Sequence, residues 1–420
     1  MSRLAGRPGP RGGVPMSRLA GRPGPRRGVA TARIAGKARA WAELLRVSAL
    51  LSVPGDALAG AVAAGARPGR GTLCAIGASL CLYEAGMALN DWADRAEDAV
   101  ERPHRPLPSR RITPGAALAA SAALTVTGLA LAARAGRPSL AVATALATTV
   151  WSYDLGLKHT PAGPATMAAA RALDLLLGAT ASTSGTVRPS TAGHLAPPVT
   201  PAGHLAPPVT PAGHSAPPAT PARTVRARGR AWRALPSAAL LGAHTYAVTT
   251  VSRHETQGGS TATPLAALAV TMTVAAAVSG VARGAVTDGV TDAVTDGVTG
   301  AVMGAVTGGR PTPAAVPFPS GGPAPAPRPR PALPSRGPHP SPRLGALLAL
   351  AYARTPATLL LHAALNPSAA LTERAVGGGV RATIPLQAAL AARAGSPGTA
   401  LVLLGLVPAA RALARKVSPT

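Results

Sequence analysis

The feature that most constrains this chain is a series of apolar segments, most of them about twenty residues long and nearly free of charge. A helix rises about 1.5 Å per residue, so about twenty apolar residues cross a hydrocarbon layer roughly 30 Å thick. Of the 420 residues, 47% are hydrophobic and 14% are charged, a balance typical of polytopic membrane proteins. The nine segments are 44–65, 72–90, 113–133, 138–153, 163–183, 234–251, 263–282, 344–364 and 398–413. The sequence therefore predicts an all-α membrane protein of about nine transmembrane helices.

Two long segments interrupt the apolar pattern. Residues 186–230 carry a Pro-rich ten-residue repeat that begins at His194 and returns at His204 and His214, whereas residues 284–343 combine a Val-Thr-Asp-Gly type of repeat with a Pro-rich tract. Both compositions are typical of flexible loops without a packed core. The expected organisation is a disordered basic tail (1–43), helices 1–5 (44–185), a low-complexity loop (186–230), helices 6 and 7 (231–283), a second low-complexity loop (284–343), and helices 8 and 9 with a C-terminal tail (344–420).

The net charge of +27 raises the question of nucleic-acid binding, because basic patches neutralise phosphates. Many of the arginines, however, lie among Gly and Pro, only 2% of residues are aromatic, and no nucleic-acid-binding module is recognisable. Basic loops also set membrane orientation, because they stay on the cytoplasmic side. With the N-terminus inside, the loops after helices 2, 4, 6 and 8 are cytoplasmic, and the last of these contains Arg374 and Arg381. We therefore expect a multi-pass plasma-membrane protein whose partner is the lipid bilayer, and no nucleic acid.

The most informative polar segment, Asn90-Asp91-Trp92-Ala93-Asp94-Arg95-Ala96-Glu97-Asp98, lies at the end of the second apolar segment. Asp91, Asp94 and Asp98 are spaced i, i+3 and i+7, which places three carboxylates on one face of a continuous helix. Clustered anions repel one another unless a cation joins them, and Mg²⁺ prefers carboxylate and phosphate oxygens. The spacing therefore predicts that these three aspartates bind Mg²⁺ and, through it, a diphosphate.

Two further polar segments end the fourth and sixth apolar segments, at 153–160 and 252–255. Two helices separate each polar segment from the one before it, so all three are predicted to lie on the same face of the membrane.

These motifs resemble those of the UbiA superfamily of intramembrane prenyltransferases. Asn90, Asp91, Asp94 and Asp98 match its first acidic motif, and the following Arg102-Pro103-His104-Arg105-Pro106-Leu107 also matches. Residues 153–160 resemble its Tyr-x-x-x-Lys-x-Thr segment, and features such as Val53–Asp56 and Gly377–Arg381 suggest an EboC-like bacterial branch. The resemblance implies a prenyl diphosphate donor, a Mg²⁺ cofactor, an unidentified small-molecule acceptor and an active site at the cytoplasmic leaflet. It also implies that the catalytic residues are Asp91, Asp94, Asp98 and Lys158. The substrate-binding residues that it implies are Asn90, Arg102, Arg105, Tyr153, Asp154, Arg253, His254 and Glu255.

The chain departs from this pattern at one place. Members of the superfamily usually carry a second Asp-rich motif after the sixth helix, where this chain reads Ser252-Arg253-His254-Glu255-Thr256. Two other hypotheses therefore stay open: a polytopic transporter, and an accessory membrane protein whose catalytic site has degenerated.

Several ionisable residues fall inside the apolar segments. A charge in hydrocarbon is costly and usually marks a functional site or a charge pair. Arg171 and Asp174 are spaced i, i+3 and could neutralise each other, and Asp56 is expected to contact the acceptor rather than a metal. Glu84 is a candidate either for lining the pocket or for acting as the base toward the acceptor.

Overall fold

The computed structural model describes residues 26–46, 52–184, 229–255, 259–280 and 342–417, and all regular structure within these ranges is helical. The predicted all-α class is therefore confirmed. The two low-complexity inserts lie almost wholly outside the described residues. The longer helices are α1 (Arg26–Leu44), α2 (Val53–Ala63), α3 (Arg70–Ala93), α5 (Pro114–Ala135), α6 (Arg137–Leu155), α7 (Gly163–Ser184), α9 (Leu235–Ser252), α10 (Ala262–Ser279), α12 (Pro342–Leu365), α13 (Ala369–Arg393) and α14 (Pro397–Val417).

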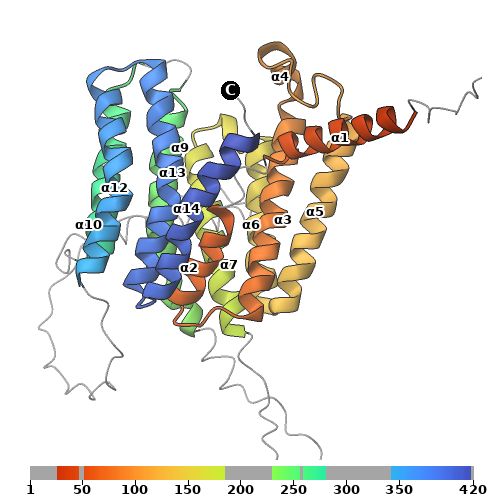
Figure 1. The fold of residues 1–420 in the computed structure, drawn as a ribbon. Coiled ribbons are helices and arrows are strands. Elements are labelled where there is room, and N and C mark those ends of the chain that lie inside the picture. The colour runs from red at the N-terminus through yellow and green to blue at the C-terminus, as the bar shows by residue number, and fades with distance from the viewer. Residues whose placement is uncertain (1–25, 47–51, 185–228, 256–258, 281–341, 418–420) are drawn as a thin grey trace, which may run out of the picture.

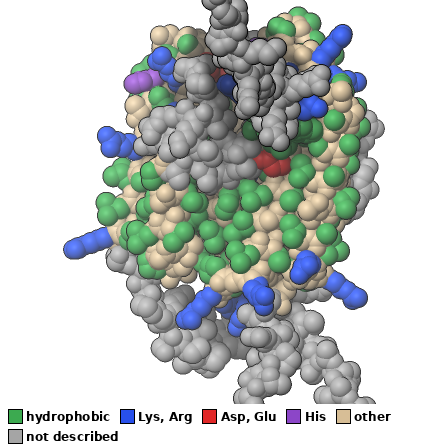
Figure 2. All heavy atoms as spheres, turned by 45° about the vertical axis from the view of Figure 1, so that its right-hand side comes forward, with side chains coloured by type: hydrophobic (Ala, Val, Ile, Leu, Met, Phe, Trp, Pro, Cys, Tyr) green, Lys and Arg blue, Asp and Glu red, His purple; other side chains and the backbone are tan. Residues whose placement is uncertain are grey.

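Most of these helices stand side by side as a bundle, and α1 lies across one end of it (Figure 1). Four described helices have the length and apolar composition needed to cross a membrane: Arg70–Ala93, Pro114–Ala135, Ala262–Ser279 and Arg343–Leu365. Basic side chains gather at both ends of the molecule, with a wide band of apolar side chains between them (Figure 2). This distribution is the one expected of a multi-pass membrane protein.

The structure corrects the sequence-based prediction near the C-terminus. We predicted a basic loop containing Arg374 and Arg381, but both residues lie within α13, a helix of 25 residues. Helix α13 is largely buried and includes polar residues such as Thr372 and Gln387 in its buried face. A helix surrounded by protein needs no continuous apolar surface, so a search for apolar runs does not find it.

The first apolar segment is also broken. Residues 44–65 were predicted to form one span, but α1 ends at Leu44 and α2 begins only at Val53, with Pro54 at its start. Proline favours this position because its fixed backbone angle suits the first turn and its missing N–H is not needed there. Helix α2 therefore has 11 residues, about half the length of a membrane span.

Close backbone contact holds α2 against α7. A Cβ atom built at Gly60 would lie 1.9 Å from the Leu175 carbonyl oxygen, and one at Gly178 would lie 2.3 Å from the Ala57 carbonyl oxygen. No larger side chain fits at either glycine without separating the two helices. This packing brings the first turn of α2, which contains Asp56, next to the middle of α7.

Candidate active site

The first acidic segment does not form one continuous helix. Helix α3 ends at Ala93, Asp94 stands at its C-terminus, and a short helix, α4 (Arg95–Glu101), carries Asp98. Arg95 helps to end α3: its Nη1 donates a 2.8 Å hydrogen bond to the Trp92 carbonyl oxygen. The prediction that one helix stacks all three carboxylates is therefore wrong, because it assumed unbroken helical geometry through Asp94.

Asp91 and Asp98 are nevertheless joined by a shared cation. Nη1 of Arg105 lies 2.8 Å from Oδ2 of Asp98 and 3.5 Å from Oδ1 of Asp91, and both aspartates are buried. Nη1 of Arg102 adds a 3.4 Å contact to Oδ1 of Asp98. The loop that follows α4 thus folds back over the end of α3, and the two arginines of the predicted motif neutralise its buried carboxylates.

Asp94 connects this cluster to the second predicted segment. Its Oδ1 forms an ion pair with Nζ of Lys158, a residue of the short 3₁₀ helix η2 (Leu157–His159) between α6 and α7. Asn90 of α3 donates a 3.2 Å hydrogen bond from its Nδ2 to Oδ1 of Asp154, which lies near the end of α6. The predicted convergence of these two segments is confirmed by both contacts, although 64 residues separate the partners in each pair.

The third predicted segment is attached more loosely. Arg253 Nη1 donates a hydrogen bond to the Thr160 carbonyl oxygen, which links the end of α9 to the loop before α7. His254 instead contacts its own helix, with Nδ1 3.3 Å from the Thr250 carbonyl oxygen. Burial, and secondarily the charge of Glu373, raise the pKa of Glu255 above its usual value, and Arg102 opposes this rise. No contact between the aspartates and either His254 or Glu255 is found among the described residues.

The prediction missed one cation of the cluster, Arg46. Its Nη2 lies 3.4 Å from Oδ1 of Asp91, so Asp91 is approached by arginines from two directions. The backbone of Arg46 has a φ of 48°, a left-handed conformation that is uncommon outside glycine. In the sequence this residue is one arginine among many at the start of an apolar segment, and nothing local marks it as part of a site.

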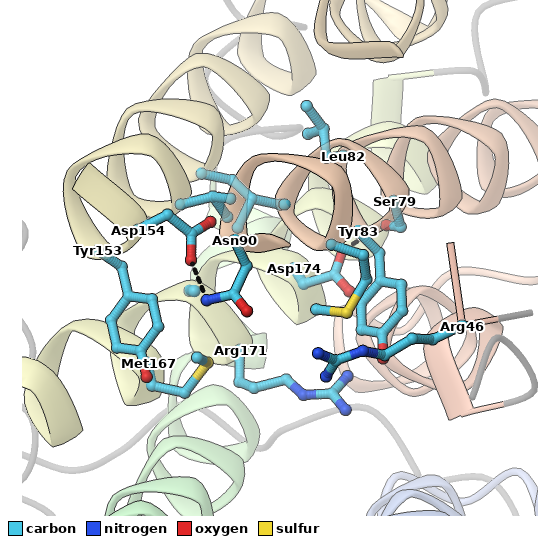
Figure 3. A pocket seen from close by; sticks show the side chains of 15 residues that line it. Arg46, Ser79, Leu82, Tyr83, Asn90, Tyr153, Asp154, Met167, Arg171 and Asp174 are labelled. Carbon is cyan, nitrogen blue, oxygen red and sulfur yellow. Dashed lines mark hydrogen bonds between the residues drawn. The ribbon is translucent and has the colours of Figure 1, made fainter. Parts of the chain in front are cut away.

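A cavity of about 300 Å³ lies beside this cluster, between α3, α6 and α7 (Figure 3). Asn90, Tyr153 and Asp154 line its outer end, and Arg46 also lines the cavity, on the side of Tyr83 (Figure 3). Its middle wall includes apolar residues: Leu82, Met87, Leu146, Val150, Met167 and Ala170. The buried Glu84 is not among the lining residues, and neither of its carboxyl oxygens has a hydrogen-bond partner. The expectation that Glu84 faces the pocket is therefore wrong for this cavity.

The inner end of the cavity is charged. Arg171 and Asp174 line it, but the ion-pair partner of Arg171 is Asp56 of α2, rather than Asp174 as the spacing suggested. Gln387 Nε2 donates a 2.7 Å hydrogen bond to Asp56 Oδ1, and the Ser79 hydroxyl donates to Asp174 Oδ1. The short α2 therefore supplies a buried carboxylate that local spacing could not assign to Arg171.

The donor set fits a hard divalent cation in part. Among the described residues, no three His, Cys, Asp or Glu side chains are grouped closely enough to hold a metal ion. Asp91 and Asp98, however, already share one cationic group, the Arg105 guanidinium, and both offer carboxylate oxygens of the kind that Mg²⁺ prefers. Two of the three predicted metal ligands thus meet around one cation position, whereas Asp94 pairs with Lys158.

Comparisons with known proteins agree with these motifs. Residues 55–287, more than half of the chain, match the model of the UbiA prenyltransferase family. The chain is 33% identical over 123 residues to a digeranylgeranylglyceryl phosphate synthase of Methanopyrus kandleri, and 42% identical over 84 residues to the protein of that name from Methanothrix thermoacetophila. These alignments cover 29% and 20% of this chain and 45% and 32% of the relatives, so less than half of each relative is spanned.

The fold can also be compared with solved structures. A UbiA homolog from Aeropyrum pernix K1 superposes over 81% of this chain and 96% of its own, with a TM-score of 0.45 and 13% sequence identity. By the match over residues 55–287, the chain belongs to the UbiA prenyltransferase family.

Proposed function

We propose that this protein transfers an isoprenoid group from an allylic prenyl diphosphate to a small-molecule acceptor, with Mg²⁺ assisting the departure of diphosphate. The observation that carries the proposal is the joining of Asp91, Asp98 and Arg105 with Asp94 and Lys158 beside a largely apolar cavity. In a member of the UbiA prenyltransferase family, this is the arrangement that a polar diphosphate with an apolar tail requires.

Asp91 and Asp98 are the residues that would hold Mg²⁺, with Asp94 as a further carboxylate nearby. When bound, the metal ion supplies positive charge against the charge that develops on the departing diphosphate. Lys158 and Arg105 neutralise aspartates in this structure. Both cations would bind phosphate oxygens of the donor, where charge-assisted hydrogen bonds would stabilise the leaving group.

The cavity then accounts for the second half of the reaction. The allylic C–O bond breaks with its electron pair on the diphosphate, and the acceptor atom bonds to the allylic carbon and loses a proton. We assign Asp154, the lining carboxylate at the outer end, as the group that takes this proton. Apolar walls such as Leu82 and Val150 keep out the water that would otherwise trap the carbocation.

We place the site in the plasma membrane at the cytoplasmic face. The loops that follow α3 and α6 lie at the same end of the bundle, and they carry Arg102, Arg105 and Lys158 (Figure 1). Basic loops of this kind favour the cytoplasmic side.

The proposal is tested by measuring Mg²⁺-dependent diphosphate release from geranyl and farnesyl diphosphates in membranes that contain the protein and a lipid extract as the acceptor source. Asp91→Asn and Asp98→Asn are expected to lower the rate of diphosphate release at least about 100-fold, because each removes a negatively charged carboxylate that would bind Mg²⁺. Glu97→Gln is the matched control, because Glu97 is an exposed carboxylate in the same segment. Release that does not depend on Mg²⁺, or an equal loss in all three variants, would contradict the proposal.

One observation favours a second candidate, a catalytically degraded accessory protein. Each of the three aspartates is already neutralised by Arg or Lys, so the cluster is electrostatically balanced by the chain's own side chains. Measuring prenyl diphosphate binding alongside diphosphate release separates the two candidates. Diphosphate binding without turnover in any lipid extract would indicate the accessory role, and no binding at all would favour a transporter.

A further inference from the structure

The inner end of the cavity holds charged groups that diphosphate chemistry does not use. Asp174 and Arg171 line this end, Arg171 pairs with Asp56, and Ser79 donates to Asp174. Asp56 and Asp174 are both buried within the bundle. Charged groups far from the polar ends of a membrane protein are costly, so their presence beside a cavity needs a functional reason.

The two ends of the cavity are separated by a definite length. Ser79 and Asn90 both lie on α3 and line the inner and outer ends respectively (Figure 3). The eleven residue steps from Ser79 to Asn90 correspond to roughly 16 Å along a helix. An extended isoprene unit adds four chain bonds, or about 5 Å, by ordinary carbon–carbon geometry. The distance between the ends is therefore close to three isoprene units.

The wall between these ends suits a hydrocarbon chain. Leu82 and Met87 come from α3, Leu146 and Val150 from α6, and Ala170 from α7. A chain that extended beyond Ser79 would have to separate Arg171 from the buried Asp56, and losing that partner leaves an uncompensated carboxylate in the interior. The charged end is thus a barrier to apolar groups, whereas the walls above it favour them.

We propose that Ser79, Asp174 and Arg171, the last held by its ion pair with Asp56, form the floor of the donor site and limit the donor chain to about three isoprene units. The inference rests on the proposed function. It predicts a preference for geranyl and farnesyl diphosphates over geranylgeranyl diphosphate. In this respect the chain would differ from its relatives from Methanopyrus and Methanothrix, whose names contain a geranylgeranyl group.

The test is equilibrium binding, in detergent-solubilised protein, of the unreactive S-thiolodiphosphates of geranyl, farnesyl and geranylgeranyl alcohols. The unsubstituted protein is expected to bind the farnesyl compound at least about tenfold more tightly than the geranylgeranyl compound, because each methylene excluded from apolar contact changes affinity about fourfold. Ser79→Leu fills the inner end of the cavity and so shortens it. This variant is expected to weaken farnesyl binding at least about tenfold, while geranyl binding changes less than about threefold.

Three further variants distinguish an effect of cavity size on binding from a general loss of protein stability. Ser79→Ala removes the hydrogen bond to Asp174 without filling the cavity, so it is expected to keep the farnesyl preference. Ala170→Leu narrows the cavity without replacing a charged group or Ser79, and it is expected to lower farnesyl binding as Ser79→Leu does. Ala122→Leu adds the same bulk on the exposed face of α5 and is expected to change nothing.

The outcomes distinguish this inference from the proposed function. Equal binding of all three compounds would contradict a limit on chain length and would indicate that the prenyl tail leaves the cavity sideways between helices. An equal loss of binding of all three compounds in Ser79→Leu would also contradict this limit. Binding of none of the compounds would overturn the proposed function together with the inference. An unchanged donor preference in both Ser79→Leu and Ala170→Leu would assign the charged end to a polar group of the acceptor instead.

Discussion

At the scale of single residues, charge compensation is the main organising force. Asp56 illustrates it: its carboxylate is fully buried, pairs with Arg171 and accepts a 2.7 Å hydrogen bond from Gln387. These three residues come from three different helices. Their pairing cannot be read from local spacing, which pointed to Asp174 as the partner of Arg171.

Removing both members of this pair is expected to cost less stability than the sum of the two single removals. Asp56→Ala leaves the Arg171 guanidinium without its counter-ion and should lower stability by about 3 kcal/mol, while the double variant Asp56→Ala/Arg171→Ala should lose less than the sum of the two single variants. Thermal unfolding of the detergent-solubilised protein measures all three. Strictly additive losses would show that the pair contributes no coupling energy.

At the scale of elements, glycines decide which helices can meet. The contact between α2 and α7 depends on backbone atoms touching at Gly60 and Gly178. The run of small residues in these helices indicates close packing in general. It does not say which helix lies against which, because many segments of this chain are rich in Ala and Gly.

A side chain at Gly60 should therefore separate α2 from α7. Gly60→Val is expected to destabilise the protein by more than about 2 kcal/mol, because its Cβ would overlap the Leu175 carbonyl oxygen and backbone atoms cannot move aside as a side chain would. Gly115→Ala in α5 is the control, since a Cβ there meets no atom within 4 Å. Similar melting temperatures for the two variants would argue against the close contact.

At the scale of the whole molecule, the site depends on loops that follow α3 and α6 lying at one end of the bundle. The opposite end also carries arginines, including Arg67 between α2 and α3 and Arg137 at the start of α6, so charge alone distinguishes the two ends weakly. The orientation we propose is therefore best tested directly.

In a background without Cys74 and Cys81, the two cysteines of the chain, Ser109→Cys should react with a membrane-impermeant maleimide only from the cytoplasmic side. Ser109 is exposed in the loop at the site end of the bundle, whereas Arg67→Cys, at the opposite end, should react only from outside. Labelling in intact and in opened cells distinguishes the two sides. The reverse pattern would place the site at the outer face.

Sequence alone determined the all-α class, the apolar helices and the two polar segments that meet at Asp94 and Lys158. It could do so because hydrophobic length and motif spacing are local properties. It did not find α13, the break of the acidic helix at Asp94, or the part taken by Arg46. Those features depend on which groups are buried against which, and only the tertiary structure sets that, since charge pairing and close packing join residues far apart in the chain.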